Sequence, residues 1–484
     1  MLRVNISFPS GSGKTLLLPE HSKVGDLKLL AQKTLGKSFL KLVCADGHVL
    51  SNPEESLQAA GVQEGHDLMA VVQQSQIAAS HRSFALWCCG GNRVAAWGDP
   101  RRGGDCSAVQ DQLRNVQQLQ ATADGAYAAI LVDGSVVAWG HPEWGGNCCV
   151  VQDQLRDVQE IQATSRAFAA ILADGSIVTW GYPRRGGDCS AVQDQLRNVQ
   201  QIQATSGAFA AILADGSVVS WGDPDRGADC SAVRDQLKQV QQIQATAFAF
   251  AAILVDGSVV AWGNPGWGGN CCVVQDQLRD VQEIQATNRA FAAILADGSV
   301  VAWGDPNSGG DCSAVQDQLR NVKQIQATKS AFAVVLACGS VVAWGDSGRG
   351  GDCSVVQDQL RNVQQIQATA NGAFAAILVD GSVVAWGDGG DCSAVRDQLR
   401  HVQQIQGTYA AFAAVLVDGS VVAWGHPDWG GDCSAVQDQL RDVQEIQATT
   451  RAFAAILADG SVVAWGPSAY GGDYSKVQDE LQYL

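Results

Sequence analysis

Cysteine is the most reactive residue type in this chain, and it recurs at one place in nearly every copy of a long repeat. Metal sites usually take closely spaced ligands such as Cys-x-x-Cys, whereas these cysteines lie a whole repeat apart. That spacing favours small buried thiols over a metal centre or a catalytic nucleophile. The recurring cysteines are Cys106, Cys148, Cys189, Cys230, Cys271, Cys312, Cys353, Cys392 and Cys433.

Two other patterns have the composition of a chemical site. Gly11-Ser12-Gly13-Lys14-Thr15 matches the end of a phosphate-binding loop, but Phe8 stands where that motif needs a glycine. We interpret it as a turn between two strands. Asp194 and Arg197 recur in most repeats, whereas a catalytic carboxylate would occur once. They therefore predict a capping or inter-blade contact, which would contribute little to stability if it is exposed. We therefore expect no enzyme activity, no metal and no cofactor.

Three loops hold an extra tryptophan that could anchor a protein partner. These residues are Trp144, Trp267 and Trp429. Exposed Trp is a typical interface anchor, and the alternative is that each ring packs over its neighbouring repeat. The loop after each Trp-Gly is one of two segments that vary between copies, and the other follows each Gln-Ala-Thr. Loops on a rigid scaffold often carry function, so both variable segments are candidates for binding specificity.

A repeat of nearly constant length must position these loops. Its copies are marked by Trp-Gly pairs at intervals of 42, 41, 41, 41, 41, 41, 42, 38 and 41 residues. A fixed period indicates one supersecondary unit stacked on copies of itself. The pairs begin at Trp97, Trp139, Trp180, Trp221, Trp262, Trp303, Trp344, Trp386, Trp424 and Trp465.

Each copy predicts at least three strands. In the copy from Ala167, the runs AFAAIL and SIVTW flank an Asp-Gly turn and predict a hairpin whose strands are covered on both faces. Gln200–Thr205 partly alternates and suits a third strand. The stretch SAVQDQLRNV that precedes it could be a short helical turn or a fourth, outer strand.

The repeats resemble those of the regulator of chromosome condensation family over residues 83–484. The resemblance lies in the Trp-Gly hairpin end, the Gly-Gly loop and the spacings V-x-x-x-L-x-x-V-x-x-I and A-x-L-x-x-G-x-V-x-x-W-G. It implies a mainly β fold, as a β-propeller or closed array of about ten short blades, although family members use seven longer repeats. The array starts with a lone hairpin (Phe84–Gly98) and ends with a lone half-copy (Gly471–Leu484). These two half-copies could close a ring by pairing with each other. An open solenoid, however, could also begin at any point within the repeat.

Residues 1–72 lack the repeat and predict a small α+β domain. The expected elements are strands Leu2–Phe8 and Thr15–Leu18, helix Lys23–Leu35, and strands around Leu40–Cys44 and Leu68–Val72. The order, with HSKVGDLKLLAQKTLG, LKLVCADGHVL and DLMAVV, resembles ubiquitin-like (β-grasp) domains.

In ubiquitin-like domains an apolar patch is recognised by receptors. The resemblance places this patch near Val43 and Val71, which could equally be ordinary strand residues. The chain continues beyond Val72 where ubiquitin ends in Gly-Gly, so we expect no conjugation. Residues 73–82 are small and polar and predict a linker.

Charge and hydropathy limit the partners and the location. The chain has a net charge of −17, and residues 1–72 contribute none of it. Such a surface repels phosphate backbones, so we expect no nucleic-acid binding. The sequence has no apolar run long enough to span a membrane and no signal peptide. We therefore expect an intracellular protein, cytoplasmic or nuclear or both, whose cysteines are mostly thiols.

Together these features predict a protein-interaction adaptor. The repeat array would bind a client protein, and the ubiquitin-like domain would contact ubiquitin receptors, ligase components or the proteasome. Some large ubiquitin ligases carry similar propellers, but their catalytic domain has no counterpart here. By family resemblance alone, the alternative is a guanine-nucleotide exchange factor for a small GTPase. The sequence does not identify the client.

Overall fold

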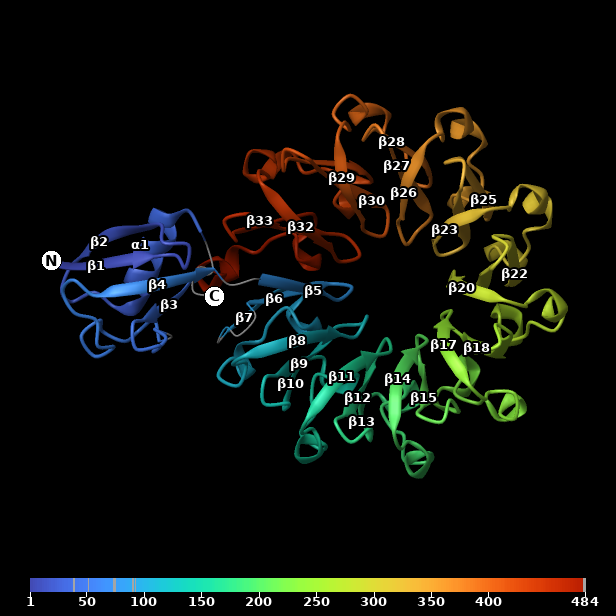
Figure 1. The fold of residues 1–484 in the computed structure, drawn as a ribbon, viewed down its shortest axis with the longest axis horizontal. Coiled ribbons are helices and arrows are strands. Elements are labelled where there is room, and N and C mark those ends of the chain that lie inside the picture. Colours follow the sequence, from blue (N-terminus) through green and yellow to red (C-terminus); the bar gives the residue numbers. More distant parts are fainter. Residues whose placement is uncertain (38–39, 51, 73–74, 89–90, 92, 482–484) are drawn as a thin grey trace.

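Strands dominate the computed structural model, which describes all residues except 38–39, 51, 73–74, 89–90, 92 and 482–484. One four-stranded sheet comes first, and ten three-stranded sheets follow in the described chain. Figure 1 shows the ten sheets arranged around a central opening, with the four-stranded unit beside them. The mainly β architecture with ten short blades is therefore confirmed.

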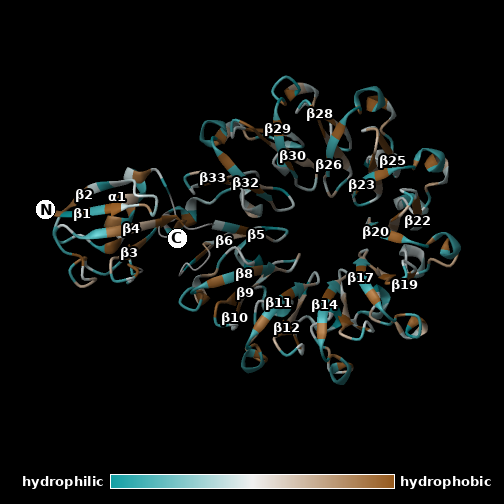
Figure 2. Cartoon of the chain, in the orientation of Figure 1, coloured by the Kyte–Doolittle hydropathy of each residue, from teal (hydrophilic) through white to brown (hydrophobic). Residues whose placement is uncertain are grey.

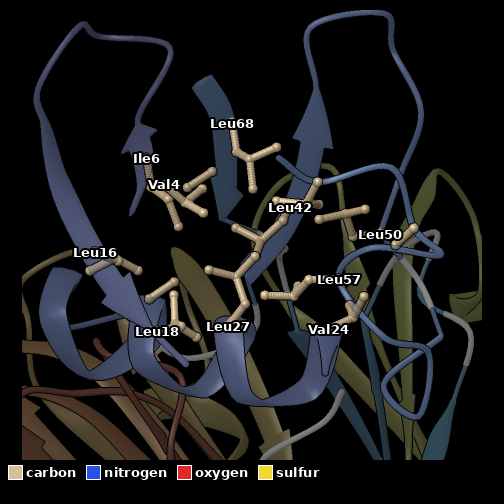
Figure 3. Packing of buried hydrophobic residues seen from close by; sticks show 14 of the residues in the cluster. Val4, Ile6, Leu16, Leu18, Val24, Leu27, Leu42, Leu50, Leu57 and Leu68 are labelled. Atoms are coloured by element: carbon tan, nitrogen blue, oxygen red, sulfur yellow. The ribbon is translucent and has the colours of Figure 1, made fainter. Parts of the chain in front are cut away.

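The N-terminal unit has the element order that the sequence predicts. Its sheet order is β2-β1-β4-β3, with β1 and β4 parallel and the other pairs antiparallel. The helix packs Val24, Leu27 and Ala31 into the core beneath this sheet, as Figure 3 shows for the first two. The elements are β1 (Leu2–Ser7), β2 (Gly13–Leu18), α1 (Val24–Leu35), β3 (Leu40–Cys44) and β4 (Asp67–Val72).

The predicted linker 73–82 is wrong over most of its length. Ser75–Ala79 forms strand β5, which pairs antiparallel with β6 (Ser83–Cys88) and buries Ile77. The pattern Gln-Ile-Ala is a weak copy of the Gln-Ile-Gln-Ala motif, and one apolar residue was too little to predict a strand. Only residues 73 and 74 separate β4 from β5.

Each three-stranded sheet, called a blade below and numbered from the N-terminus, consists of an inner, a middle and an outer strand. The first blade is β5, β6 and β7 (Val94–Gly98). The second to fifth are β8 (Val116–Ala121), β9 (Ala126–Leu131), β10 (Val136–Gly140); β11 (Val158–Ala163), β12 (Ala167–Leu172), β13 (Ile177–Gly181); β14 (Val199–Ala204), β15 (Ala208–Leu213), β16 (Val218–Gly222); and β17 (Val240–Ala245), β18 (Ala249–Leu254), β19 (Val259–Gly263).

The remaining five blades repeat the same plan, and a short helix α2 (Gln478–Leu481) follows them. Their strands are β20 (Val281–Ala286), β21 (Ala290–Leu295), β22 (Val300–Gly304); β23 (Val322–Ala327), β24 (Ala331–Leu336), β25 (Val341–Gly345); β26 (Val363–Ala368), β27 (Ala373–Leu378), β28 (Val383–Gly387); β29 (Val402–Gly407), β30 (Ala411–Leu416), β31 (Val421–Gly425); and β32 (Val443–Ala448), β33 (Phe453–Leu457), β34 (Val462–Trp465).

The core of the array lies between successive blades. In the fourth blade, Phe209 of β15 packs toward the third blade, while Ala208, Ala210 and Ile212 pack toward the fifth. Both faces of the middle strand are therefore buried, as its continuous apolar sequence predicts. Figure 2 shows hydrophobic stretches within the strands around the ring. The ambiguous stretch contains a short 3₁₀ turn, such as Gln193–Gln195, before the inner strands of the second to tenth blades, rather than a fourth strand.

The two ends of the array meet. The backbone N–H of Thr450 in the tenth blade donates to the carbonyl of His81 in the first, at 3.2 Å. Trp97 donates its indole N–H to the Gly471 carbonyl at 3.0 Å. The C-terminal segment also packs Val477 and Leu481 into one cluster with Phe84. The half-copies at the two chain ends thus complete one another.

A left-handed backbone position recurs before the inner strands of the second to tenth blades. In the described chain nine non-glycine residues have positive φ, and seven of these are Asn or Asp, which tolerate this conformation best. Gln239 adopts φ 55° there and is one of the two exceptions. Its Cα also lies close to Gly216 of the preceding turn. We expect Gln239→Asn to stabilise the protein by about 0.5–1 kcal/mol, measured as a raised midpoint of urea unfolding.

The control for that prediction is Asn198→Gln at the equivalent position of the preceding repeat, where φ is also 55°. It should destabilise the protein by a similar amount. Equal stability of both variants and the natural protein would contradict a strained backbone at this position.

Candidate protein-binding face

The two variable segments of each repeat lie at the same end of its blade. The inner and middle strands are joined by the segment after Gln-Ala-Thr, and the outer strand ends at Trp-Gly. Because neighbouring strands are antiparallel, both segments emerge on one side. In the fifth blade the rings of Phe248 and Trp267, one from each segment, are 4.0 Å apart. The turns and loops of all blades together form one surface, which we call the variable face. In the fifth blade it consists of the turn 247–248 and the loop 264–267.

Backbone hydrogen bonds link the turns of the variable face around the central channel. Ser165 N–H donates to Ser206 O, and Ser206 N–H donates to Ala247 O, at 3.2 and 3.3 Å. Equivalent bonds pass through every blade junction to the one between Thr450 and His81. A pocket of about 690 Å³ at the mouth of this channel is lined mainly by Ala, Ser and Thr, together with His81 and Tyr409. The turns are therefore held rigidly at the channel mouth.

Trp144, predicted as an anchor, lies half-buried on the variable face. The guanidinium groups of Arg102 and Arg166 each lie 5.0 Å from its ring centroid, and His141 stacks on it at 3.7 Å. Arg166 is also ion-paired with Asp124 at 2.6 Å. The surrounding side chains come from three successive blades.

Trp267 and Trp429 have similar surroundings and are also half-buried. Trp267 contacts Phe248, and Arg289 lies 4.7 Å from its ring centroid. Trp429 stacks on Tyr409 at 4.6 Å between ring centroids. The three Trp residues therefore combine packing on neighbours with partial exposure, and their role as anchors stays a prediction.

In the N-terminal unit, Val43 and Val71 lie on the outward face of the sheet. Both are half-buried, and they belong to the paired strands β3 and β4. Val43 pairs directly with Met69, whose side chain is 41% exposed. The three residues form an apolar strip, while alternate residues such as Leu42 and Leu68 point into the core. The structure thus brings the two predicted patch residues to one surface, and recognition of that surface stays a prediction.

The recurring cysteines have a packing role. The Cys312 thiol donates to Gln316 Oε1 at 3.1 Å, and Gln316 Nε2 donates to the Val300 carbonyl at 3.0 Å. Burial raises the pKa of this thiol, so it stays protonated. Among the described residues no group of three His, Cys, Asp or Glu side chains could hold a metal ion. The repeated Asp194 and Arg197 form an exposed pair at 3.9 Å.

Sequence comparison missed how arginine stacks on the aromatic residues of the variable face. Tyr409, Tyr470 and Phe248 belong to variable segments but were not singled out, because only the extra Trp residues stood out by size. Contacts between turns and loops of different blades could not be read from a single repeat. The sequence signal for this stacking is the presence of both arginines and aromatic residues at the variable positions.

No family model matches the chain, and no curated protein matches it either. Among solved structures, Prp20p of Saccharomyces cerevisiae, the yeast RCC1, is 14% identical over 73% of this chain and 82% of its own, with a TM-score of 0.35. The CRINKLY WD40 ectodomain of the Arabidopsis thaliana receptor kinase ACR4 is 16% identical over 54% and 92%, with a TM-score of 0.30.

A second part of the chain has its own structural neighbour. The N-terminal ubiquitin-like domain of the 4931431F19Rik protein is 25% identical and covers 16% of this chain and 81% of that chain, with a TM-score of 0.15. No helix in the described residues is both long and apolar enough to cross a membrane.

Proposed function

We propose that the protein is a non-enzymatic, intracellular adaptor that holds a client protein on the variable face and presents it to the ubiquitin system. The observation that carries the proposal is the convergence of both variable segments on one rigid face. A scaffold that varies most there, around a hydrogen-bonded ring of turns, suits specific protein binding. The net charge of −17 disfavours nucleic acid as the client.

The ubiquitin-like unit is connected to the array in a way that suits this role. Residues 73 and 74 alone separate β4 from β5, and Lys37 Nζ donates to the Ala458 carbonyl of the tenth blade at 3.1 Å. The unit therefore sits at a defined place beside the first and last blades. Its apolar strip, Val43, Met69 and Val71, would contact ubiquitin receptors, ligase components or proteasome subunits.

The adaptor proposal can be tested on the ubiquitin side with the full chain. We expect Val43→Ser, Met69→Ser and Val71→Ser together, or deletion of residues 1–72, to abolish pulldown of a panel of purified ubiquitin receptors. The matched control is Leu17→Ser, an exposed apolar residue of β2 that is 56% exposed and outside the strip. Unchanged association after the triple substitution, or faster nucleotide release from a panel of small GTPases, would overturn the proposal.

A further inference from the structure

Arg451 is a guanidinium group held between two aromatic rings on the variable face. Its Cζ lies 4.0 Å from the ring centroid of Trp429 and 4.8 Å from that of Tyr470. The two rings come from the loops of the ninth and tenth blades, and Arg451 comes from the turn of the tenth. Stacking orients the guanidinium and leaves its N–H groups as donors in one plane.

Within the described part of the chain, Arg451 lacks the acidic partner that its equivalents Arg82 and Arg289 have. Arg82 is paired with Asp99 at 3.8 Å, and Arg289 with Asp305 at 4.0 Å. Each of these aspartates directly follows the Trp-Gly of the same blade. In the tenth blade that position is Pro467, and the described residues form no ion pair with Arg451. The loop substitution therefore leaves one positive charge uncompensated.

The aromatic and basic residues continue on both sides of Arg451. On one side Trp429 stacks on Tyr409, which has Lys329 Nζ 5.8 Å from its ring centroid. On the other side Arg82 lies 5.0 Å from the ring centroid of Tyr470. Lys329 is exposed and, like Arg451, takes part in no ion pair among the residues that the structure describes. The sector spans the seventh to first blades and presents unpaired cations beside aromatic rings.

The charge of this sector is opposite to that of the whole chain. The turns of the sector, in the seventh to first blades, contain three basic residues and no acidic one, and its loops after Trp-Gly contain three arginines and four aspartates, so the sector is net positive. A net positive rim on a chain of net charge −17 attracts carboxylates locally while the remaining surface repels phosphate-rich polymers. The complement to the sector is thus a short acidic peptide segment rather than a nucleic acid.

We propose that the sector formed by Lys329, Tyr409, Trp429, Arg451, Tyr470 and Arg82 binds an acidic segment of the client protein. Arg451 donates to one Asp or Glu carboxylate, which takes the place that Asp305 occupies beside Arg289, and the aromatic rings pack on the peptide around it. This inference rests on the proposed function, because it identifies which part of the variable face binds the client. It does not depend on recognition of the ubiquitin-like unit.

The test measures binding of a fluorescein-labelled Glu-Gly peptide to the full chain by fluorescence anisotropy, with a Gln-Gly peptide as the neutral comparison. We expect Arg451→Gln to weaken binding of the acidic peptide about tenfold. Pro467→Asp should weaken it as much, because the new carboxylate occupies Arg451. That variant should fold, since Asp346-Ser347 forms the same loop turn in the seventh blade. Arg289→Gln is the control, because its guanidinium is already paired.

The expected result is selective loss in the two tenth-blade variants, with both retaining the natural thermal midpoint. The proposal would be overturned if Arg451→Gln and Pro467→Asp bound the acidic peptide as tightly as the natural chain does. It would also be overturned if the natural chain bound the Gln-Gly peptide as tightly as the Glu-Gly peptide. Equal competition by a single-stranded oligonucleotide would also overturn it. Because no ubiquitin component is present, failure here is distinguishable from failure of the receptor pulldown.

Discussion

Removal of residues 471–484 is expected to open the ring of blades and to lower the unfolding free energy by about 4 kcal/mol or more. Loss of even one large buried aliphatic side chain costs about 2–5 kcal/mol, and this segment buries Val477 and Leu481 against the first blade. It also supplies the Gly471 carbonyl that accepts from Trp97. Small-angle X-ray scattering should show a larger radius of gyration, and thermal unfolding should begin at a lower temperature.

The control for the truncation ends the chain at Leu481 and keeps all of these contacts. It should remain as compact and as stable as the natural protein. A compact and fully stable chain ending at Tyr470 would contradict the conclusion that the C-terminal segment joins the tenth blade to the first.

Trp303→Phe is expected to be more destabilising than Trp424→Phe by about 2 kcal/mol. The indole N–H of Trp303 donates to the Gly268 carbonyl at 3.0 Å in the preceding loop. Nine of the ten Trp-Gly tryptophans make this bond, and Trp424 does not. Its buried N–H has no partner in the described chain. Both substitutions lose the same volume, but only the first also loses a hydrogen bond.

The missing bond has a visible cause in the sequence. The repeat between Trp386 and Trp424 is 38 residues long, and the loop after β28 lacks the 3₁₀ turn that the other blades carry there. Removing the Trp424 indole N–H therefore relieves an unsatisfied buried donor. The measurement is the shift of the urea midpoint in each variant. Equal shifts for the two variants would show that these hydrogen bonds contribute nothing to stability.

Local pattern was sufficient for most of the elements. The apolar runs on each side of Asp-Gly turns predicted the middle and outer strands, because hairpins depend on neighbouring residues and on turn chemistry. Helix α1 was predicted within one residue at its start, since its buried face follows helical spacing. Strand β5 was missed because its single buried residue, Ile77, contributes too little pattern, and pairing with β6 decides its conformation.

The sequence by itself determined the repeat, its ten copies and the two segments that vary, because these are properties of neighbouring residues and of comparison between copies. Only the tertiary structure decided that both segments share one face, that the chain ends meet, and that Arg451 stacks on rings from two blades without an acidic partner among the described residues. Those features depend on contacts between residues a repeat or more apart. Such contacts arise from blade packing, which brings distant side chains together and leaves no periodic signal in the chain.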